Sequence, residues 1–513
     1  MSEAHLATEK RDTQTQEKTT EATVTTQPQI DLYPQNDLEN LQKSRWERSW
    51  PVIACGAGLF SDGYLNNIIG SVNTILRTLY PDSYTNSPAV KNVPSISFAG
   101  TVLGQLIFGY VSDHYSRKWA LMISTLILIV FAALSAGSYG INGSSYGLFA
   151  ALTAYRFFLG VGIGGEYPAG SVAAAESTGE LKKGHRNRWF IMFTNLQINL
   201  GFVVAAFVPM ILVLIFTENH LRAAWRVMLG LGVLPPLSLC YLRLKLNEPE
   251  EFNRERLHTY PVWLIIKLYW RRLSVVSSIW FIYNFSVYAF GIYSSIWLKL
   301  VLADTAPLWK SFGWNTVVNM FYIPGSILGA FVSDWIGPRY TLAAGVFAQG
   351  VIGFIMSASY QYLATPQHVA AFVVVYGIFL SLGELGPGDN VGIFASKTCA
   401  TAVRGQYYGI AAAMGKVGAF VGTYLFPIIQ KNAPNQVRAG QDPFFVSSAL
   451  CILSAGIALF LLPHVGQDTI TLEDFRFRRY LEENGYDTST MGSKELRESQ
   501  RQRGDSSGGS ASI

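Results

Sequence analysis

Five ionisable side chains lie inside stretches of sequence that are otherwise apolar: Asp62, Glu166, Glu384, Asp389 and Lys416. A charged side chain at the centre of a bilayer costs about 3 kcal/mol or more, so each of these residues needs a partner or a function. A carboxyl group removed from water can take up a proton near neutral pH. A buried lysine is stable where it meets an anion. We therefore expect Lys416, Glu166 and Glu384 to line one central cavity, where a charged small molecule and a proton meet.

Two further patterns place polar groups beside these residues. One is a stripe on a single helix face, because residues spaced i, i+4 and i+8 point the same way: Trp280, Asn284 and Tyr288. The other is LSLGELGPGDNVGIF, in which Pro387 and nearby glycines predict a broken helix, as at transporter binding sites. Glu384 and Asp389 in this run would repel a dianion and suit a cation, which aromatic faces also bind.

The composition indicates that membrane-spanning helices position these groups. Half of the 513 residues are hydrophobic and 14% are charged, whereas soluble domains contain roughly 25% charged residues. A spanning helix needs about 20 mostly apolar residues, and about twelve segments satisfy this rule. They fall near 50–74, 93–112, 119–139, 146–172, 189–216, 223–243, 274–302, 313–335, 340–360, 368–394, 405–430 and 443–463. The sequence therefore predicts an all-α membrane protein.

Basic residues in short loops give the orientation, because cytoplasmic loops carry an excess of Lys and Arg. The connections after the second, fourth and sixth segments contain Arg117, Lys118, Lys182, Lys183, Arg186, Arg188, Arg254, Arg256, Arg271 and Arg272. The loop after the third segment, SYGINGSSYG, is uncharged. We therefore expect both termini in the cytoplasm, and Asn142, in a glycosylation sequon, outside.

The chain divides into five predicted regions. Two six-helix halves, 49–244 and 274–463, are related by a repeat: GQLIFGYVSDHYSRK starts at Gly104 and GSILGAFVSDWIGPR at Gly325. Between them, a cytoplasmic linker at 245–273 contains PVWLIIKLYWRRL, whose aromatic residues and arginines are typical of an interfacial helix. The polar segments 1–48 and 464–513 are predicted to be disordered cytoplasmic tails.

These motifs resemble those of a known family of transporters. GxxxxGxxSDxxxRK is similar to the signature loop of the major facilitator superfamily, and RFFLGVGIG is similar to its fourth-helix pattern. In that pattern Gly160 and Gly164 predict close helix packing. GVGIGGEYP resembles a motif of the phosphate:proton symporters. SDGYLN at 61–66, GGEYP at 164–168, GPGD at 386–389, ATAVRG at 400–405 and GKVGAFVG at 415–422 resemble the fungal glycerophosphodiester permeases. The resemblance spans all the predicted helices and implies the major facilitator fold, with two six-helix halves.

The resemblance also implies roles for individual residues. Asp62 and Glu166 would carry protons. The substrate would contact Tyr167, Gln197, Trp280, Asn284, Tyr288, Glu384, Gly388, Asp389 and Lys416, the last of these binding phosphate. Gating salt bridges at cytoplasmic helix ends would use Asp113, Arg117, Lys118, Asp334, Arg339 and Arg404. Asn284 stands where the symporters have an acid, and Gly388 where they have a phosphate-coordinating asparagine, so the site would admit a phosphate that carries organic groups.

The sequence thus predicts proton-coupled uptake of glycerophosphodiesters across the plasma membrane by alternating access. The resemblance gives inositol-type permeases an asparagine at the position of Glu384, so the acid favours glycerophosphocholine and its quaternary ammonium. Alternatives are a glycerophosphoinositol permease, an inorganic phosphate:proton symporter, or a non-transporting nutrient receptor on the same fold. Structural alternatives also stay open: Glu166 could form a salt bridge that holds the fourth helix, and Lys416 could pair with Glu384 or Asp389.

Other classes of function lack their motifs in this sequence. A nucleotide-binding loop and a nucleophile elbow are absent, and no two histidines have metal-ligand spacing. We therefore expect a transporter and not an enzyme, with no cofactor and no metal site. The expected partners are the small-molecule substrate, protons and the lipid bilayer, without nucleic acid, and the chain is expected to be a monomer.

Overall fold

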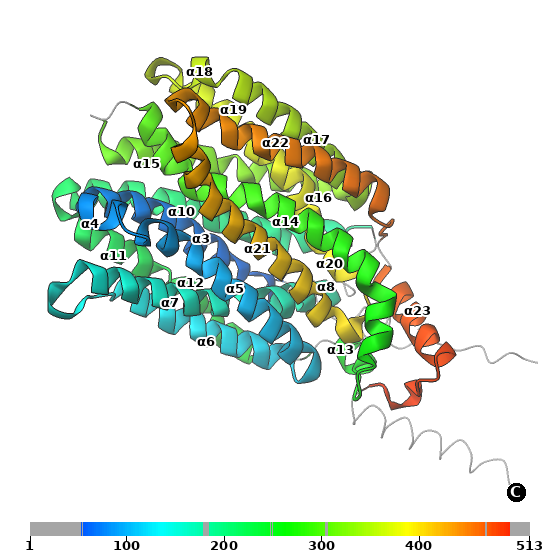
Figure 1. Ribbon diagram of the computed structural model, residues 1–513. Coiled ribbons are helices and arrows are strands. Elements are labelled where there is room, and N and C mark those ends of the chain that lie inside the picture. The colour runs from blue at the N-terminus through cyan, green and yellow to red at the C-terminus, as the bar shows by residue number, and fades with distance from the viewer. Residues whose placement is uncertain are drawn as a thin grey trace, which may run out of the picture. The chain divides into compact units, whose positions relative to one another are not determined.

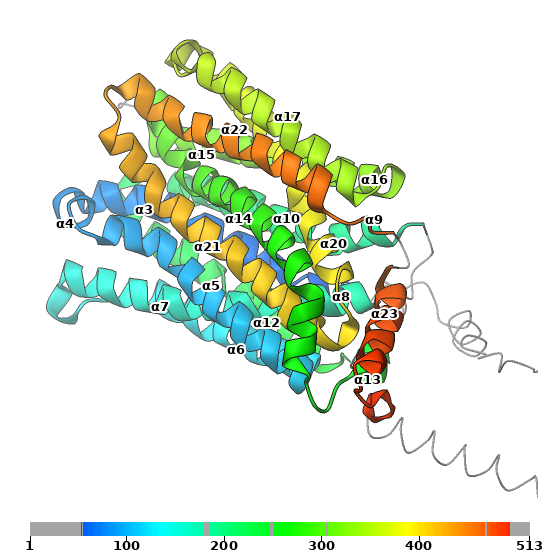
Figure 2. The same cartoon turned by 45° about the vertical axis from the view of Figure 1, so that its right-hand side comes forward.

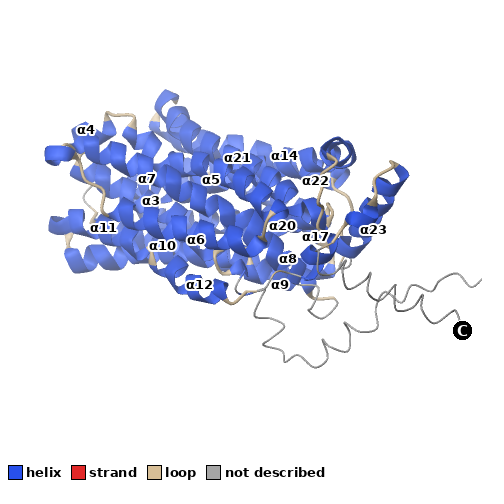
Figure 3. Cartoon of the chain, turned by 90° about the horizontal axis from the view of Figure 1, so that it is seen from below, coloured by secondary structure: helices blue, strands red, loops and turns tan. Residues whose placement is uncertain are grey.

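A computed structural model describes residues 53, 55–177, 184–246, 248, 250–302, 306–466 and 469–492, all within the unit Arg45–Ile513. These residues form helices joined by short loops and contain no strand, as the sequence predicts (Figure 3). Predictions for the N-terminal tail, for Lys182 and Lys183, and for the residues after 492 lie outside the described residues.

The helix bounds follow the predicted segments closely over most of the chain. What we call the N-terminal half contains α3 (Leu59–Leu79), α4 (Pro81–Thr85), α5 (Ala89–His114), α6 (Arg117–Ala136), η1 (Ile141–Gly143), α7 (Ser145–Gly165), η2 (Glu166–Ser171), α8 (Val172–Ser177), α9 (Arg186–Phe193), α10 (Asn195–Phe216), η4 (Glu218–His220), α11 (Leu221–Leu231) and α12 (Leu234–Leu244). The C-terminal half contains α14 (Val262–Val301), α15 (Leu308–Met320), α16 (Tyr322–Trp335), α17 (Pro338–Ala358), α18 (Tyr360–Leu363), η5 (Pro366–His368), α19 (Val369–Gly383), η6 (Glu384–Gly388), α20 (Asp389–Lys397), η7 (Thr401–Val403), α21 (Arg404–Asn432) and α22 (Gln436–Leu461). Outside the halves lie α13 (Glu250–Glu255), α23 (Thr469–Glu483) and η8 (Thr488–Thr490).

Within the described residues, eleven helices are long and apolar enough to cross a membrane. The remaining predicted segment corresponds to α3, which is less apolar because it contains Asp62, Asn66, Asn67 and Asn73. All four of these side chains are buried. The polar residues of α3 therefore face the protein interior, so a hydropathy criterion underrates this helix.

Small residues let neighbouring helices approach closely. Helices α5 and α7 lie side by side, as do α14 and α21 (Figures 1 and 2). A Cβ at Gly160 would lie 2.0 Å from the carbonyl oxygen of Ser97, and one at Gly164 would lie 2.5 Å from that of Thr101. These contacts confirm the predicted packing role of the two glycines, because any side chain there would push α7 away from α5.

The fourth helix of each half is interrupted by a π-helical turn, a feature that often marks functional sites. In the C-terminal half, η6 includes Gly386, whose φ of −84° and ψ of −106° leave the helical range, and Pro387, which has no N–H to donate. This confirms the predicted break. In the N-terminal half, η2 contains Glu166 and Tyr167, where the sequence did not indicate one.

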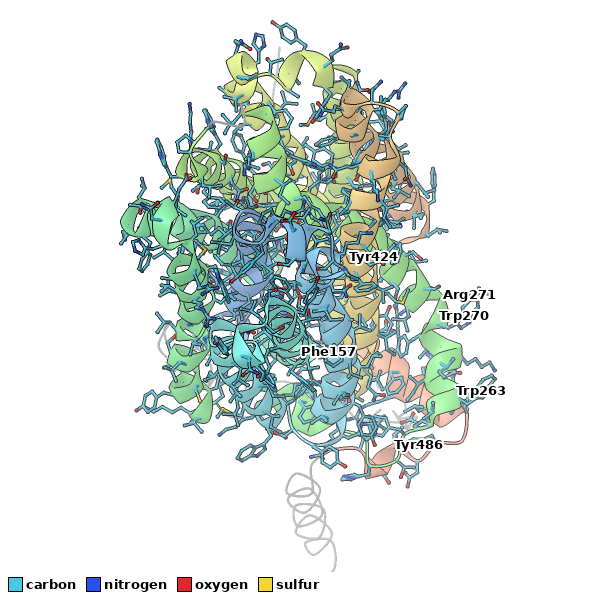
Figure 4. The ribbon with its side chains drawn as sticks, turned by 60° about the vertical axis from the view of Figure 1, so that its left-hand side comes forward. Phe157, Trp263, Trp270, Arg271, Tyr424 and Tyr486 are labelled. Carbon is cyan, nitrogen blue, oxygen red and sulfur yellow. The ribbon has the colours of Figure 1, made fainter. Side chains whose placement is uncertain are left out.

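No helix break separates the predicted interfacial helix from the seventh spanning helix. Helix α14 runs unbroken over 40 residues, or about 60 Å, because no Gly or Pro interrupts it between Val262 and Phe290. Trp263 and Trp270 near its start are 75% and 54% exposed and, with Arg271, point away from the other helices (Figure 4). The interfacial character of this segment stays a prediction.

The predicted disorder of the C-terminal tail is also wrong for residues 469–483, which form α23. Ile470, Phe477 and Leu481 are buried, and their spacing puts them on one side of the helix. Phe477 and Leu481 pack with Tyr269 of α14 and Tyr407 of α21. Figures 1 and 2 show α23 beside α13 and the start of α14.

Candidate functional site

A pocket lies between the two halves and contains most of the predicted substrate ligands. Seven of them line it: Tyr167, Trp280, Asn284, Tyr288, Glu384, Gly388 and Asp389. The two helix breaks, η2 and η6, contribute to this wall, and α3, α9, α10, α14, α20, α21 and the junction between α9 and α10 supply the rest. The cavity volume is about 50 Å³, whereas ligand pockets usually measure roughly 300–1,000 Å³. The helices must therefore part before a small organic molecule can enter.

Lys416 lies behind two tyrosines of the pocket wall and pairs with Asp62. Its Nζ is 3.3 Å from Oδ2 of Asp62 and donates a hydrogen bond to the hydroxyl of Tyr288. It is also 4.1 Å from the ring centre of Tyr288 and 4.8 Å from that of Tyr167. The possible pairing of Lys416 with Glu384 or Asp389 is thereby ruled out in this state. Lys416 is one side chain away from the cavity and can be reached if the tyrosines move.

Asp62 is held in place by neutral donors as well as by Lys416. The Tyr167 hydroxyl donates to its Oδ2, and the Asn66 amide donates to its Oδ1. Asp62 lies in the first turn of α3, where the helix dipole favours a negative charge. Asp62, Lys416, Tyr167 and Tyr288 therefore form one buried cluster, which we call the ion-pair cluster.

Glu384 and Asp389 form a second group of charges, separate from the ion-pair cluster. Both accept hydrogen bonds from Nδ2 of Asn195, at 2.7 and 2.8 Å. Glu384 also accepts from the Tyr283 hydroxyl at 2.6 Å. A Cβ added at Gly388 would lie 2.5 Å from Oε2 of Glu384. Glu384 therefore occupies part of the space that a side chain at residue 388 would fill.

The prediction that Lys416, Glu166 and Glu384 line one cavity is wrong: Glu384 lines the pocket, Lys416 lies behind its wall, and Glu166 does not line it. Both of its carboxylate oxygens accept hydrogen bonds from Arg243 of α12, each at 2.6 Å. Glu166 and Arg243 are buried and do not line the pocket. This geometry matches the structural alternative, in which a salt bridge formed by Glu166 holds the fourth helix. Proton transfer by Glu166 stays a prediction. Arg243 was not predicted as a partner of Glu166 because it is the last residue of the predicted sixth segment, 223–243.

Gln197 does not line the pocket; its Nε2 donates to the carbonyl of Met192 at 3.3 Å. Asn195 and Asn199 line it instead. Within NLQIN, residues i and i+4 share a helix face and residue i+2 lies on the other side. The spacing of the two asparagines could therefore have identified them, whereas the family resemblance pointed to Gln197.

Three predicted gating residues meet in one ionic network at the end of α5. Arg117 lies 3.0 Å from Asp113 and 2.8 Å from Glu176 of α8. Arg404 of α21 lies 3.0 Å from the same glutamate, and Asp113 accepts from the backbone N–H of Gly405 at 2.8 Å. Glu176 and Asp113 thus join the N-terminal half to the C-terminal half. A role in gating stays a prediction.

The other three predicted gating residues lie elsewhere. The backbone N–H of Lys118 donates to Glu248 at 3.2 Å. Asp334 lies 4.0 Å from Arg188 of α9, and Arg339 donates to the carbonyl of Leu459. Among the described residues, Asp334 and Arg339 of the second copy of the repeated motif thus contact Arg188 and Leu459, whereas Asp113 and Arg117 of the first contact Gly405 and Glu176.

Comparisons with known proteins agree with this arrangement. The Sugar (and other) transporter family model matches residues 50–259 and 249–474. The major glycerophosphoinositol permease GIT3 of Candida albicans is 53% identical over 465 residues, 89% of this chain and 86% of that protein. The glycerophosphocholine permease GIT4 of the same organism is 53% identical over 450 residues, 86% of this chain and 84% of that protein.

A solved structure supports the fold alone. The proton:xylose symporter XylE, bound to 6-bromo-6-deoxy-D-glucose, superposes with a TM-score of 0.67 at 16% sequence identity, covering 84% of this chain and 98% of that one. That protein belongs to the major facilitator superfamily, which confirms the predicted fold. The chain therefore belongs to the Sugar (and other) transporter family and, within it, to the fungal glycerophosphodiester permeases.

Proposed function

We propose that the chain takes up glycerophosphodiesters, above all glycerophosphocholine, across the plasma membrane together with protons. The observation that carries this proposal is the separation of charge around one pocket. Lys416 lies behind the wall at one place, and Glu384 with Asp389 forms the wall at another. Glycerophosphocholine carries the complementary charges, a phosphodiester anion and a quaternary ammonium. A relative of 53% identity is a glycerophosphocholine permease.

Exchange of partners at Lys416 accounts for the coupling of cargo to a proton. Without cargo, Asp62 neutralises Lys416. When a phosphodiester binds Lys416, Asp62 loses its cation and is left as a buried carboxylate, which favours its protonated form. One proton then enters with each phosphodiester and offsets its charge. Against a negative-inside membrane potential, each uncompensated charge would cost about 2.3 kcal/mol per 100 mV.

The second group of charges accounts for the choice of head group. Quaternary ammonium groups bind to aromatic faces and carboxylates. Trp280, Tyr283 and Tyr288 line the pocket with Glu384 and Asp389. The second candidate cargo is glycerophosphoinositol, favoured by the relative that carries that name. Its inositol hydroxyls would donate hydrogen bonds to the same carboxylates.

The small cavity supports alternating access, in which each half rotates to open the pocket to one side at a time. We propose that the network of Asp113, Arg117, Glu176 and Arg404 closes the cytoplasmic side, and that both termini lie there. The chain is proposed to act as a monomer, since both groups of charges are completed within one chain.

Uptake by cells that lack their own permeases and express this chain tests the proposal. We expect accumulation of labelled glycerophosphocholine that rises at acidic external pH and exceeds that of glycerophosphoinositol. Inorganic phosphate in equal amount should compete weakly. Uptake of phosphate alone would contradict the proposal, as would binding without accumulation, which is the result expected of a receptor.

Glu384→Asn tests the head-group assignment. Asparagine keeps a hydrogen-bonding group but removes the charge, so glycerophosphocholine uptake should fall about tenfold or more while glycerophosphoinositol uptake falls less. This corresponds to about 1.4 kcal/mol lost for the ammonium ion. The ratio of the two initial rates is the measurement, which cancels differences in expression. An equal loss for both cargoes would remove the ammonium argument.

A further inference from the structure

Glu384 and Asp389 share a single hydrogen-bond donor. Nδ2 of Asn195 lies 2.7 Å from Oε2 of Glu384 and 2.8 Å from Oδ1 of Asp389. An amide nitrogen carries two hydrogens, so one asparagine can serve both acceptors. The two acceptor oxygens therefore lie no further apart than two hydrogen-bond lengths. We call these two residues the carboxyl pair.

The contacts of the carboxyl pair do not include a cation. Among the described residues neither carboxyl forms an ion pair, and Glu384 and Asp389 are only 2% and 1% exposed. The remaining donors are neutral: the hydroxyls of Tyr283 and Ser326, at 2.6 and 2.5 Å, and the amide of Asn199, at 2.9 Å. Two buried carboxylates this close to each other would repel each other, which favours the binding of a proton by one of them.

As far as the structure describes the chain, the elements packed around the carboxyl pair bring no compensating charge. Helices α10 and α19 contain no Asp, Glu, Lys, Arg or His. Charged residues elsewhere in the surrounding helices have other contacts: Asp334 with Arg188, Arg339 with the carbonyl of Leu459, Lys397 with Asn187, and Lys416 with Asp62. The basic residues of α14 lie near its two ends. The titratable groups that face the pair are tyrosines: Tyr283, Tyr288 and Tyr322.

One oxygen of the carboxyl pair is placed to bear the proton. Oδ2 of Asp389 is buried and accepts no hydrogen bond within the described part of the chain. The other oxygens of the pair all accept hydrogen bonds. Oδ2 is therefore the oxygen of the pair on which a hydrogen would displace no existing donor, and protonation there would remove the charge from a buried acceptor.

We propose that Glu384 and Asp389 together bind one proton while the pocket is closed and release it when the halves separate. Asn195 and Asn199 belong to the N-terminal half, and the carboxyl pair belongs to the C-terminal half. Opening removes the amide donors and admits water. The O–H bond of the shared acid then breaks, the proton passes to water, and two hydrated carboxylates remain.

This proton is additional to the one proposed for Asp62, so the inference rests on the proposed proton coupling. With one proton bound, the carboxyl pair keeps one negative charge. That charge suffices to attract the ammonium group of glycerophosphocholine.

Infrared spectroscopy of the purified full-length chain in lipid tests the bound proton directly. A protonated carboxyl has a C=O stretching band that shifts in D₂O. We expect the double variant Glu384→Gln/Asp389→Asn, which keeps the shape of both side chains, to lose intensity in this band at neutral pH. Asp82→Asn, at an exposed position on α4, should lose none. Full intensity in the double variant would overturn the proposal.

A single variant covers the case in which the double variant does not fold. In Asp389→Asn the like charge is gone, so the carboxyl band that remains should titrate at lower pH than the band of the pair in the unaltered chain. An unchanged titration would equally overturn the proposal.

Proton counting in proteoliposomes separates the carboxyl pair from the proposed coupling. Protons taken up per labelled cargo are measured with an internal pH indicator. If the unaltered chain moves no proton with its cargo, the proposed coupling fails, while the infrared band still decides whether the carboxyl pair holds a proton.

Discussion

Lys416 and Asp62 are each unstable alone in a buried site and are stabilised as a pair. Removing one partner of a buried ion pair costs about 3–5 kcal/mol, because the other charge is left without compensation. We expect Lys416→Ala to abolish uptake and to lower the melting temperature of the purified protein.

The double variant Lys416→Met/Asp62→Asn serves as the control for this prediction. It removes both charges, so it should recover most of the stability without recovering uptake. If the double variant were as unstable as Lys416→Ala, the ion pair would not account for the loss of stability in the single variant. Normal uptake by Lys416→Ala would exclude it as the phosphate ligand.

At the residue scale, the sequence identified which side chains carry charge into the membrane but not their partners. The stripe of Trp280, Asn284 and Tyr288 was predictable because helical spacing alone puts the three residues on one face. The partners Arg243 and Asn195 were not, because each lies on a helix distant in sequence from the acid it contacts. A pairing across helices depends on helix rotation, which periodicity leaves undetermined.

At the scale of helices, Glu166 and Arg243 tie the fourth helix of the N-terminal half to its sixth. Arg243→Leu should lower the free energy of unfolding by about 3–5 kcal/mol. Arg243→Leu with Glu166→Leu should lower it less, because no buried charge is left unpaired. Guanidinium unfolding in detergent provides the measurement. The pH dependence of uptake distinguishes the two roles of Glu166. If the pair is purely structural, uptake by the double variant should keep the pH profile of the unaltered chain. If Glu166 carries a proton, the profile should change.

The docking of α23 should depend on pH. Asp474 accepts hydrogen bonds from the backbone N–H and the hydroxyl of Thr401, at 2.6 and 2.8 Å, and burial raises the pKa of Asp474 from 3.8 to about 6. Since the docked form binds the proton more tightly, docking is strongest at low pH and weakens as pH rises from 3.8 to about 6. The loss amounts to about 3 kcal/mol.

Hydrogen exchange of residues 469–483, corrected for the intrinsic dependence on pH, measures this docking. Protection should decrease as pH rises through this window and change little above it. Asp474→Asn cannot ionise, so its protection should not vary with pH. An identical pH dependence in the variant would assign the effect to another group.

Helix positions were predictable because spanning segments have a fixed length and strong hydropathy. The continuity of α14 and the existence of α23 were not. A membrane boundary in the sequence does not end a helix, so the aromatic and basic residues at 260–272 did not mark a break. Helix α23 is polar on most of its surface, and it docks through a few buried residues: Ile470, Glu473, Asp474, Phe477 and Leu481.

At the scale of the molecule, Glu176 is the carboxylate that accepts from arginines of both halves, Arg117 and Arg404. Glu176→Gln removes this link, and we expect the inward-open state to gain population. Initial uptake should fall several-fold, while the ratio of glycerophosphocholine to glycerophosphoinositol uptake stays the same. A cysteine introduced in the pocket should become more accessible to impermeant thiol reagents from the cytoplasmic side.

Glu248→Gln is the matched control for this variant. Glu248 accepts hydrogen bonds from the start of α6, and within the described part of the chain it does not link the halves, so its loss should not alter thiol accessibility. A change in cargo preference in Glu176→Gln would contradict a role confined to gating.

The unbroken length of α14 has a mechanical consequence. Arg272 near its start bonds Glu473 of α23, Tyr283 in its middle bonds Glu384, and Ser295 near its end lies 3.0 Å from Thr74 of α3. A continuous helix can pass a displacement applied at one end along its length. A displacement of α23 can therefore reach the pocket wall at Tyr283 and the contact between Ser295 and Thr74, which links attachment of the tail to binding of the cargo.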